Sequence, residues 1–78
     1  MGTEIKVPKI VGASRLSVGR WFKSVGDPVS LGEPVVEIET YNLTHEIQAP
    51  ATGILSKVLV KDGGSVEPGT LIGTIDQV

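Results

Sequence analysis

The fold is decided by residues 34–48, which read PVVEIETYNLTHEIQ. Apolar and polar side chains alternate on both sides of the central Tyr41-Asn42, a pattern that gives a strand one buried and one solvated face. The apolar set is Val36, Ile38, Leu43 and Ile47, and the polar set is Glu37, Glu39, Thr44 and Glu46. The stretch therefore predicts a β-hairpin of strands 34–40 and 43–48. We expect an exposed tip in which Asn42 uses its tolerance of positive φ to form a tight turn.

The rest of the chain is divided into short pieces by ten Gly and five Pro. No stretch of ten or more residues between these breakers shows helical spacing with caps, which excludes helix. The pieces alternate in polarity or are rich in β-branched residues, and they predict further strands at 3–7, 17–23, 53–60 and 70–76. Short strands at regular intervals predict an all-β fold, either a sandwich of two sheets or a flattened barrel.

The chain also repeats itself. Residues 21–32 (WFKSVGDPVSLG) align with residues 58–69 (VLVKDGGSVEPG) at an offset of 37, and the segments that follow them align as well. Upstream, Val7-Pro8 aligns with Ala49-Pro50 at an offset of 42, so the first half has five extra residues within 9–16. Two similar halves predict pseudo-two-fold symmetry, in which each half contributes strands to both sheets and the halves meet at the hairpin tip.

Composition narrows the class of protein. Seventy-eight residues, 40% hydrophobic and 21% charged, suit a single small domain spanning 1–78. The net charge is −2 and the seven Lys and Arg are scattered, so we expect no nucleic acid as a partner. No apolar run is long enough to span a membrane, no hydrophobic signal segment opens the chain, and cysteine is absent. We therefore expect a cytoplasmic monomer with no membrane partner.

Several motifs follow one another in a specific order: EIKVP at 4–8, GRWFK at 19–23, VGDPV at 25–29, EIET at 37–40, AP at 49–50, GIL at 53–55 and KDG at 61–63. In this order and spacing they resemble the lipoyl domain of the acyltransferase component of 2-oxo acid dehydrogenase complexes, most closely the dihydrolipoyllysine succinyltransferase type. The resemblance covers nearly the whole chain and implies a carrier, not an enzyme. Such a domain holds lipoate on a lysine, is reductively acylated by the thiamine-dependent decarboxylase, passes the acyl group to the transferase core and is reoxidised by dihydrolipoyl dehydrogenase.

The first departure from the family is at the lipoyl position. The family has its lysine at the hairpin tip, within ETDKV or ETDKA, and glycines stand sixteen residues before and eleven after it. Gly26 and Gly53 place that position at Asn42, where the chain reads ETYNL from Glu39 to Leu43. An amide nitrogen is not a nucleophilic amine, the other lysines lie away from the tip, and the Met-Lys-Met of biotin carriers is absent. The resemblance thus implies that this chain carries no lipoate and no other cofactor.

The second departure is the loop after Pro8, where the family reads GES followed by small or acidic residues and this chain reads KIVGASRLS at 9–17. In the family this loop lies beside the tip and helps partners to recognise the domain. We predict a protein-binding surface in loop 9–17 and tip 40–44, formed by Arg15, Leu16, Tyr41, Asn42 and Leu43.

Because both departures fall on one surface, they favour an altered or engineered carrier domain that acts as a scaffold. The alternative is a natural domain of an acyltransferase that has lost lipoylation and still docks to its complex. A third interpretation is a designed surface that associates with itself.

The remaining polar residues have structural interpretations. His45, the single histidine, shares its alternation phase with Leu43 and Ile47, so we expect it to pack partly against the sheet, and a lone histidine makes a poor metal site. The carboxylates of Glu37, Glu39 and Glu46 predict a solvated face, with partner recognition by charge as the alternative. No set of catalytic residues is evident. The glycine-rich residues 61–65 predict a turn and not a phosphate-binding loop.

Overall fold

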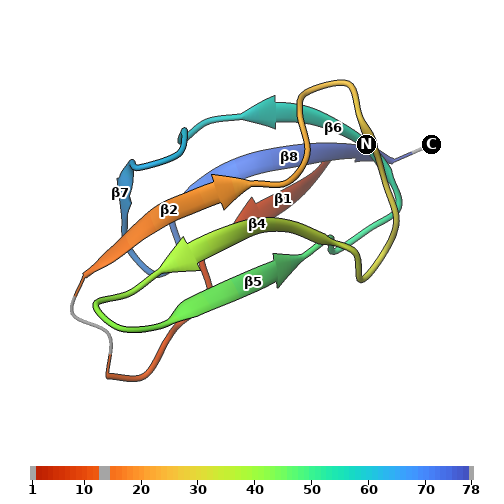
Figure 1. The fold of residues 1–78 in the computed structure, drawn as a ribbon. Coiled ribbons are helices and arrows are strands. Elements are labelled where there is room, and N and C mark those ends of the chain that lie inside the picture. The colour runs from red at the N-terminus through yellow and green to blue at the C-terminus, as the bar shows by residue number, and fades with distance from the viewer. Residues whose placement is uncertain (1, 13–14, 78) are drawn as a thin grey trace.

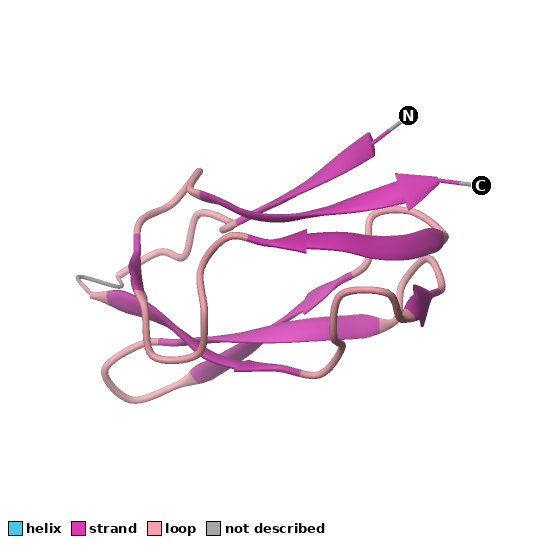
Figure 2. Ribbon diagram, turned by 90° about the horizontal axis from the view of Figure 1, so that it is seen from above, coloured by secondary structure: helices cyan, strands magenta, loops and turns pink. Residues whose placement is uncertain are grey.

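The computed structural model describes residues 2–12 and 15–77, which form two four-stranded antiparallel sheets and, within that part of the chain, no helix (Figures 1 and 2). In the first sheet the order is β1 (Gly2–Lys6), β8 (Leu71–Gln77), β6 (Gly53–Val58) and β3 (Pro28–Val29). In the second sheet it is β5 (Thr44–Gln48), β4 (Pro34–Glu39), β2 (Leu16–Trp21) and β7 (Ser65–Val66). The all-β prediction is confirmed.

The two sheets are related by the repeat in the sequence. At an offset of 37 residues β2 becomes β6, β3 becomes β7 and β4 becomes β8, while β1 becomes β5 at an offset of 42. Each half therefore contributes two strands to each sheet, as predicted. The six longer strands match predicted segments, but the two-residue strands β3 and β7 were not predicted, because two residues show no alternation.

Backbone hydrogen bonds in the two halves are related by the same repeat. The amide of Gly26 donates to the carbonyl of Leu55 at 2.8 Å, and the amide of Gly63 donates to the carbonyl of Val18. Both glycines have positive φ, 99° and 86°, a conformation that glycine adopts at the lowest cost. Gly63 belongs to the turn that was predicted for residues 61–65, and Asp62 fastens this turn to β2 by accepting the amide of Trp21 at 3.1 Å.

The hydrophobic core lies between the sheets and receives equivalent residues from the two halves. Val18 and Leu55, Ile38 and Ile75, and Val35 and Ile72 are all 0% exposed. Each such side chain stabilises the fold by about 1.5–3 kcal/mol through burial. The half-buried Trp21 packs against this core and donates from its indole nitrogen to the carbonyl of Val60 at 2.8 Å. No buried side chain in the described part is polar or charged, so hydrophobic packing dominates the stability.

The symmetry also decides what lies at each end of the molecule. The β4–β5 tip and the loop between β1 and β2 lie at the left end in Figure 1, and both termini lie at the right end. The described part measures 36 × 19 × 17 Å along its principal axes. Strand β8 is the repeat of β4, and its C-terminal end lies at the opposite end of the molecule from the tip.

Candidate binding surface at the hairpin tip

The hairpin tip is a two-residue turn closed by Thr40. The amide of Thr40 donates to the carbonyl of Leu43 at 2.8 Å, and the Thr40 hydroxyl accepts the amide of Leu43 at 3.1 Å. The same hydroxyl donates back to the Leu43 carbonyl, also at 3.1 Å. Tyr41 and Asn42 span the turn, and Tyr41 is 95% exposed. The prediction of an exposed, well-anchored tip at these residues is confirmed.

The predicted backbone conformation of Asn42 is wrong. Among the described residues only glycines have positive φ, so Asn42 does not use the left-handed region. The reason is the Thr40 side chain. Its hydroxyl, and not the Thr40 backbone carbonyl, accepts the hydrogen bond from the Leu43 amide that closes the turn. A turn closed by a side chain does not need the two positive φ angles of the tightest hairpin turns.

The loop after β1 lies against this tip. A cavity of about 80 Å³ is lined by Ile10, Val11 and Gly12 on one side and by His45 and the tip residues Thr40, Tyr41, Asn42 and Leu43 on the other. Gly12 takes a positive φ of 81° there. His45 is partly buried, as predicted, and its Nε2 is buried without a hydrogen-bond partner in the described part of the chain. The other residues around this cavity carry no formal charge.

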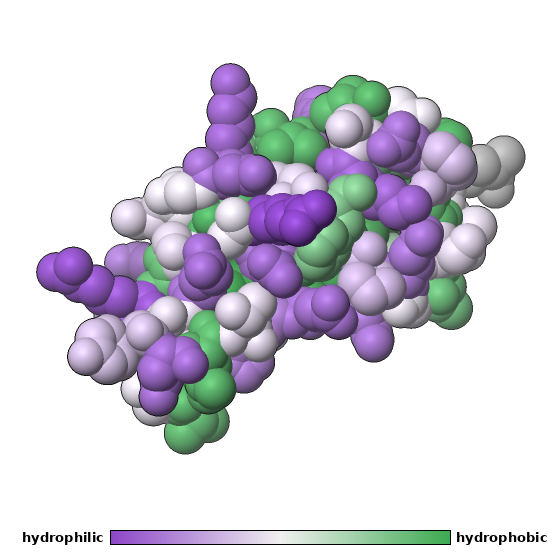
Figure 3. Space-filling view, viewed as in Figure 1, coloured by the Kyte–Doolittle hydropathy of each residue, from purple (hydrophilic) through white to green (hydrophobic). Residues whose placement is uncertain are grey.

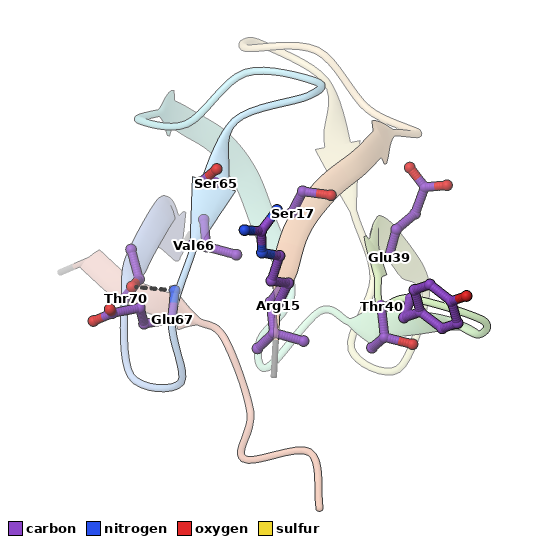
Figure 4. A pocket seen from close by; sticks show the side chains of 10 residues that line it. Arg15, Ser17, Glu39, Thr40, Ser65, Val66, Glu67 and Thr70 are labelled. Atoms are coloured by element: carbon purple, nitrogen blue, oxygen red, sulfur yellow. Dashed lines mark hydrogen bonds between the residues drawn. The ribbon is translucent and has the colours of Figure 1, made fainter. Parts of the chain in front are cut away.

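A larger groove of about 800 Å³ lies on the other side of the tip (Figure 4). Arg15 and Ser17 stand in its middle, between Glu39 and Thr40 on one side and Val66, Glu67 and Thr70 on the other. The amide of Glu67 donates to the hydroxyl of Thr70 at 3.0 Å and holds that side together. Hydroxyls and charges of both signs line the groove together with Leu16, Tyr41 and Val66, so it offers mixed polar and apolar contacts.

The predicted surface residues divide into two groups. Arg15, Tyr41, Asn42 and Leu43 are exposed, and Leu43 exposes 59% of its surface although His45 and Ile47 in the same phase are half-buried. Leu16 is different. Its side chain is only 6% exposed because β2 begins at this residue and pairs it with Val66. The prediction that Leu16 adds exposed contact area is therefore wrong.

Sequence reasoning missed one exposed apolar residue of this surface, Val11, which is 93% exposed. Gly12 signals a turn in the sequence, but nothing in the sequence shows that the side chain of Val11 before it is exposed. In Figure 3 an apolar area lies at the lower left of the visible face, where Figure 1 draws the loop after β1. Val11, Tyr41 and Leu43 are thus three large exposed side chains around one cavity at the tip end of the molecule, beside the polar Thr40 and Asn42.

The carboxylates of the hairpin lie on the outer face of the second sheet. Glu39 and Glu46 are exposed and Glu37 is half-buried, which agrees with the predicted solvated face. The Glu39 side chain lies across Gly19, where an added Cβ would meet its Cγ at 2.6 Å. The described residues hold no group of three metal-ligating side chains and no helix that is long and apolar enough to cross a membrane.

The two glycines that frame the tip in the sequence are both required by the backbone. Gly26 has a φ of 99°. Gly53 begins β6 with ordinary φ, but an added Cβ would lie 2.1 Å from the carbonyl oxygen of Asp76 on β8. One glycine therefore permits a turn and the other permits two strands to approach closely.

Comparison with known proteins agrees with this geometry. Residues 3–75 match the biotin/lipoyl family, described as "Biotin-requiring enzyme". The chain is 39% identical over 77 residues to the dihydrolipoyllysine-residue succinyltransferase component of the 2-oxoglutarate dehydrogenase complex of Bartonella vinsonii subsp. berkhoffii, covering 97% of this chain and 19% of that protein. It is 40% identical over 73 residues to the dihydrolipoyllysine-residue acetyltransferase component of the acetoin cleaving system of Bacillus subtilis, covering 92% and 18%.

The fold has a solved counterpart as well. The solution structure of the lipoyl domain of the 2-oxoglutarate dehydrogenase complex from Azotobacter vinelandii superimposes with a TM-score of 0.77 at 29% identity, covering 95% of each chain. The chain spans about a fifth of the length of the curated relatives that it matches. It belongs to the biotin/lipoyl family, as a lipoyl domain similar to those of the acyltransferases of 2-oxo acid dehydrogenase complexes.

Proposed function

We propose that this chain is a lipoyl-type docking module that bears no lipoate at its hairpin tip. The observation that supports the proposal most directly is Asn42, which occupies an exposed position in an intact tip, sixteen residues after Gly26 and eleven before Gly53. Lipoylation joins the carboxyl carbon of lipoate to a nucleophilic amine. The amide nitrogen of Asn42 has its lone pair delocalised into the carbonyl and cannot attack. The fold is thereby kept while the swinging arm has no anchor.

Docking is supported by the surface around that residue. Val11, Tyr41 and Leu43 expose 93%, 95% and 59% of their surface at one end of the molecule. Exposed aromatic and aliphatic side chains that lie together are typical of protein contacts, and tyrosine is enriched among the residues that dominate binding energy. The relatives are components of 2-oxo acid dehydrogenase complexes, so we propose the decarboxylase of such a complex as the partner.

A titration tests this docking. The isotope-labelled domain is titrated with the decarboxylase component of a 2-oxoglutarate dehydrogenase complex and followed by amide chemical shifts. We expect saturable shifts confined to residues 9–12 and 40–45, and a loss of about tenfold in affinity for Tyr41→Ser, as for an ordinary binding hot spot. Val25→Ser is the matched control, because Val25 is 59% exposed in the turn that follows β2. A flat titration, or equal losses in the two variants, would refute docking through the tip.

A second function is favoured by the position of the changes. Tyr41, Asn42 and residues 10–12 of the loop line one cavity, whereas Gly26 and Gly53 keep the spacing that the resemblance implies. We propose as the alternative a deliberately altered scaffold whose tip and loop bind a protein outside the complex. The double variant Tyr41→Asp, Asn42→Lys separates the two functions. If the parent chain does not bind the decarboxylase and the double variant does, the scaffold is the better account.

A further inference from the structure

We propose that the outer edge of β5 binds an extended cationic segment of another protein by adding it as a further strand to the second sheet. This surface is the side of the hairpin and not its tip. The proposal therefore does not depend on docking to a dehydrogenase complex or on the residue at position 42.

The first observation is that β5 has an unpaired edge. It is the last strand of the second sheet, and among the described strands it pairs only with β4 (Figure 1). The hydrogen bond between Thr40 and Leu43 fixes the alternation of the ladder, which directs the backbone groups of Thr44 and Glu46 away from β4. Within the described part of the chain, no backbone hydrogen bond outside the β4 ladder involves Thr44–Gln48. These outward donors and acceptors form a template for another strand.

The second observation is that the other edge strands are protected and β5 is not. Strands β3 and β7 have two residues each, and β3 begins with a proline. Strand β1 exposes Lys6, whose ammonium lies 3.4 Å from the carboxylate of Glu4, and the bulge in its ladder is on β8. Short length, proline, lysine and bulges are the usual means by which an edge avoids pairing. Strand β5 has five residues, THEIQ, with neither lysine nor proline, and the bulge in its ladder is on the partner strand β4, as that of β1 is on β8.

The third observation is uncompensated negative charge beside this edge. Glu46 lies directly opposite Glu37, at a position of the ladder where side chains approach most closely. Like charges in this arrangement destabilise a sheet. Neither carboxylate belongs to the ion pairs of the described residues, Lys6–Glu4 and Lys23–Glu33. Arg20 is the partner of Glu37 on β2, but its guanidinium lies over the ring of Phe22, 5.4 Å from the centroid.

These observations define the chemistry of the incoming segment. A strand added to β5 places one side chain directly beside Glu46, at about 4.5–5.5 Å between Cβ atoms, where Lys or Arg would relieve the repulsion from Glu37. Its alternate side chains point to the same side as His45 and Ile47, which are half-buried and favour apolar neighbours. The segment is therefore about five residues long, with cationic and apolar residues in alternation.

The probe for the test is the acetylated and amidated peptide Lys-Val-Lys-Val-Lys. We expect saturable amide shifts for Thr44–Gln48 and slower hydrogen exchange of the amides of Thr44 and Glu46. The same peptide with N-methyl groups on alternate amides keeps its charge but loses strand pairing, and we expect it not to bind. Equal binding of the two peptides would overturn the proposal, because attraction between charged side chains alone would then suffice.

A pair of variants tests the role of the charge. Glu46→Lys should weaken binding by about tenfold, as an attractive cross-strand pair becomes a repulsive one. Glu4→Lys is the matched control, because Glu4 is the equivalent of Glu46 at the offset of 42 and lies on the protected edge. It should leave binding within about twofold of the parent. Equal losses in both variants, or shifts in β1 instead of β5, would contradict the proposal.

Discussion

The sharpest test of the fold is Gly53→Ala. An added Cβ would lie 2.1 Å from the carbonyl oxygen of Asp76, so β6 and β8 must separate by about 1 Å to restore an ordinary contact. This movement distorts the ladder at Gly53–Gln77 and Ile54–Asp76. Two weakened hydrogen bonds at about 1 kcal/mol each, with added packing strain, give a loss of about 2–4 kcal/mol. A domain of this size has only about 4–12 kcal/mol in total, so the variant should fold but melt about 10–25 °C lower.

Gly2→Ala is the control for that experiment. Gly2 pairs with the same Asp76 from the other side of β8, but its added Cβ would find neighbours only at 3.8 Å and 3.9 Å. We expect a change within about 0.5 kcal/mol. Urea unfolding followed by the fluorescence of the single tryptophan, Trp21, measures both variants. If Gly53→Ala is as stable as Gly2→Ala, the close approach of β6 and β8 is not what requires glycine at this position.

Three further results are expected from the structure. His45→Leu should raise the free energy of unfolding by about 1 kcal/mol, because it removes a buried Nε2 that has no hydrogen-bond partner; a loss of stability in urea would mean that this nitrogen is satisfied in solution. The Ser30 amide, together with the Lys23 ammonium, lowers the pKa of Glu33 in the folded state. The Glu33 carboxylate therefore adds to the free energy of unfolding above its unfolded pKa, and this stabilisation is lost as the pH falls through its folded pKa. Glu33→Gln should therefore flatten the acid side of the curve of urea midpoint against pH, and an unchanged slope would argue against this ion pair. Trp21→Phe should cost about 1–2 kcal/mol by circular dichroism melting, because the carbonyl of Val60 loses its indole donor, and a smaller cost would show that water replaces it.

Much of the fold could be predicted because two independent patterns agree. Alternation in the hairpin identifies its buried face through Val36 and Ile38, and the repeat then carries the same arrangement into the second half through Ile75. The repeat also contained β3 and β7, since Pro28-Val29 and Ser65-Val66 are equivalent at the offset of 37. They were missed because pairing of two residues depends on the neighbouring strand and not on local propensity.

The site was harder to predict because it depends on contacts between segments. Leu16 was expected at the surface, since the sequence does not show that β2 begins there and pairs with β7. The tip turn is closed by the Thr40 hydroxyl, whereas the prediction relied on a positive φ at Asn42. The open edge of β5 could not be found from local pattern, because an edge is defined by which strand is absent beside it.

We propose that Asn42 leaves this lipoyl domain with an intact tip but no attachment lysine, and the intact mass of the protein tests this. The parent chain and Asn42→Lys are each incubated with lipoate ligase and lipoic acid, and modified residues are mapped after digestion. We expect that the parent mass does not change and that the variant gains a lipoyl group at position 42 alone. A lipoyl group on the parent chain, mapped to any of its lysines, would refute the proposal.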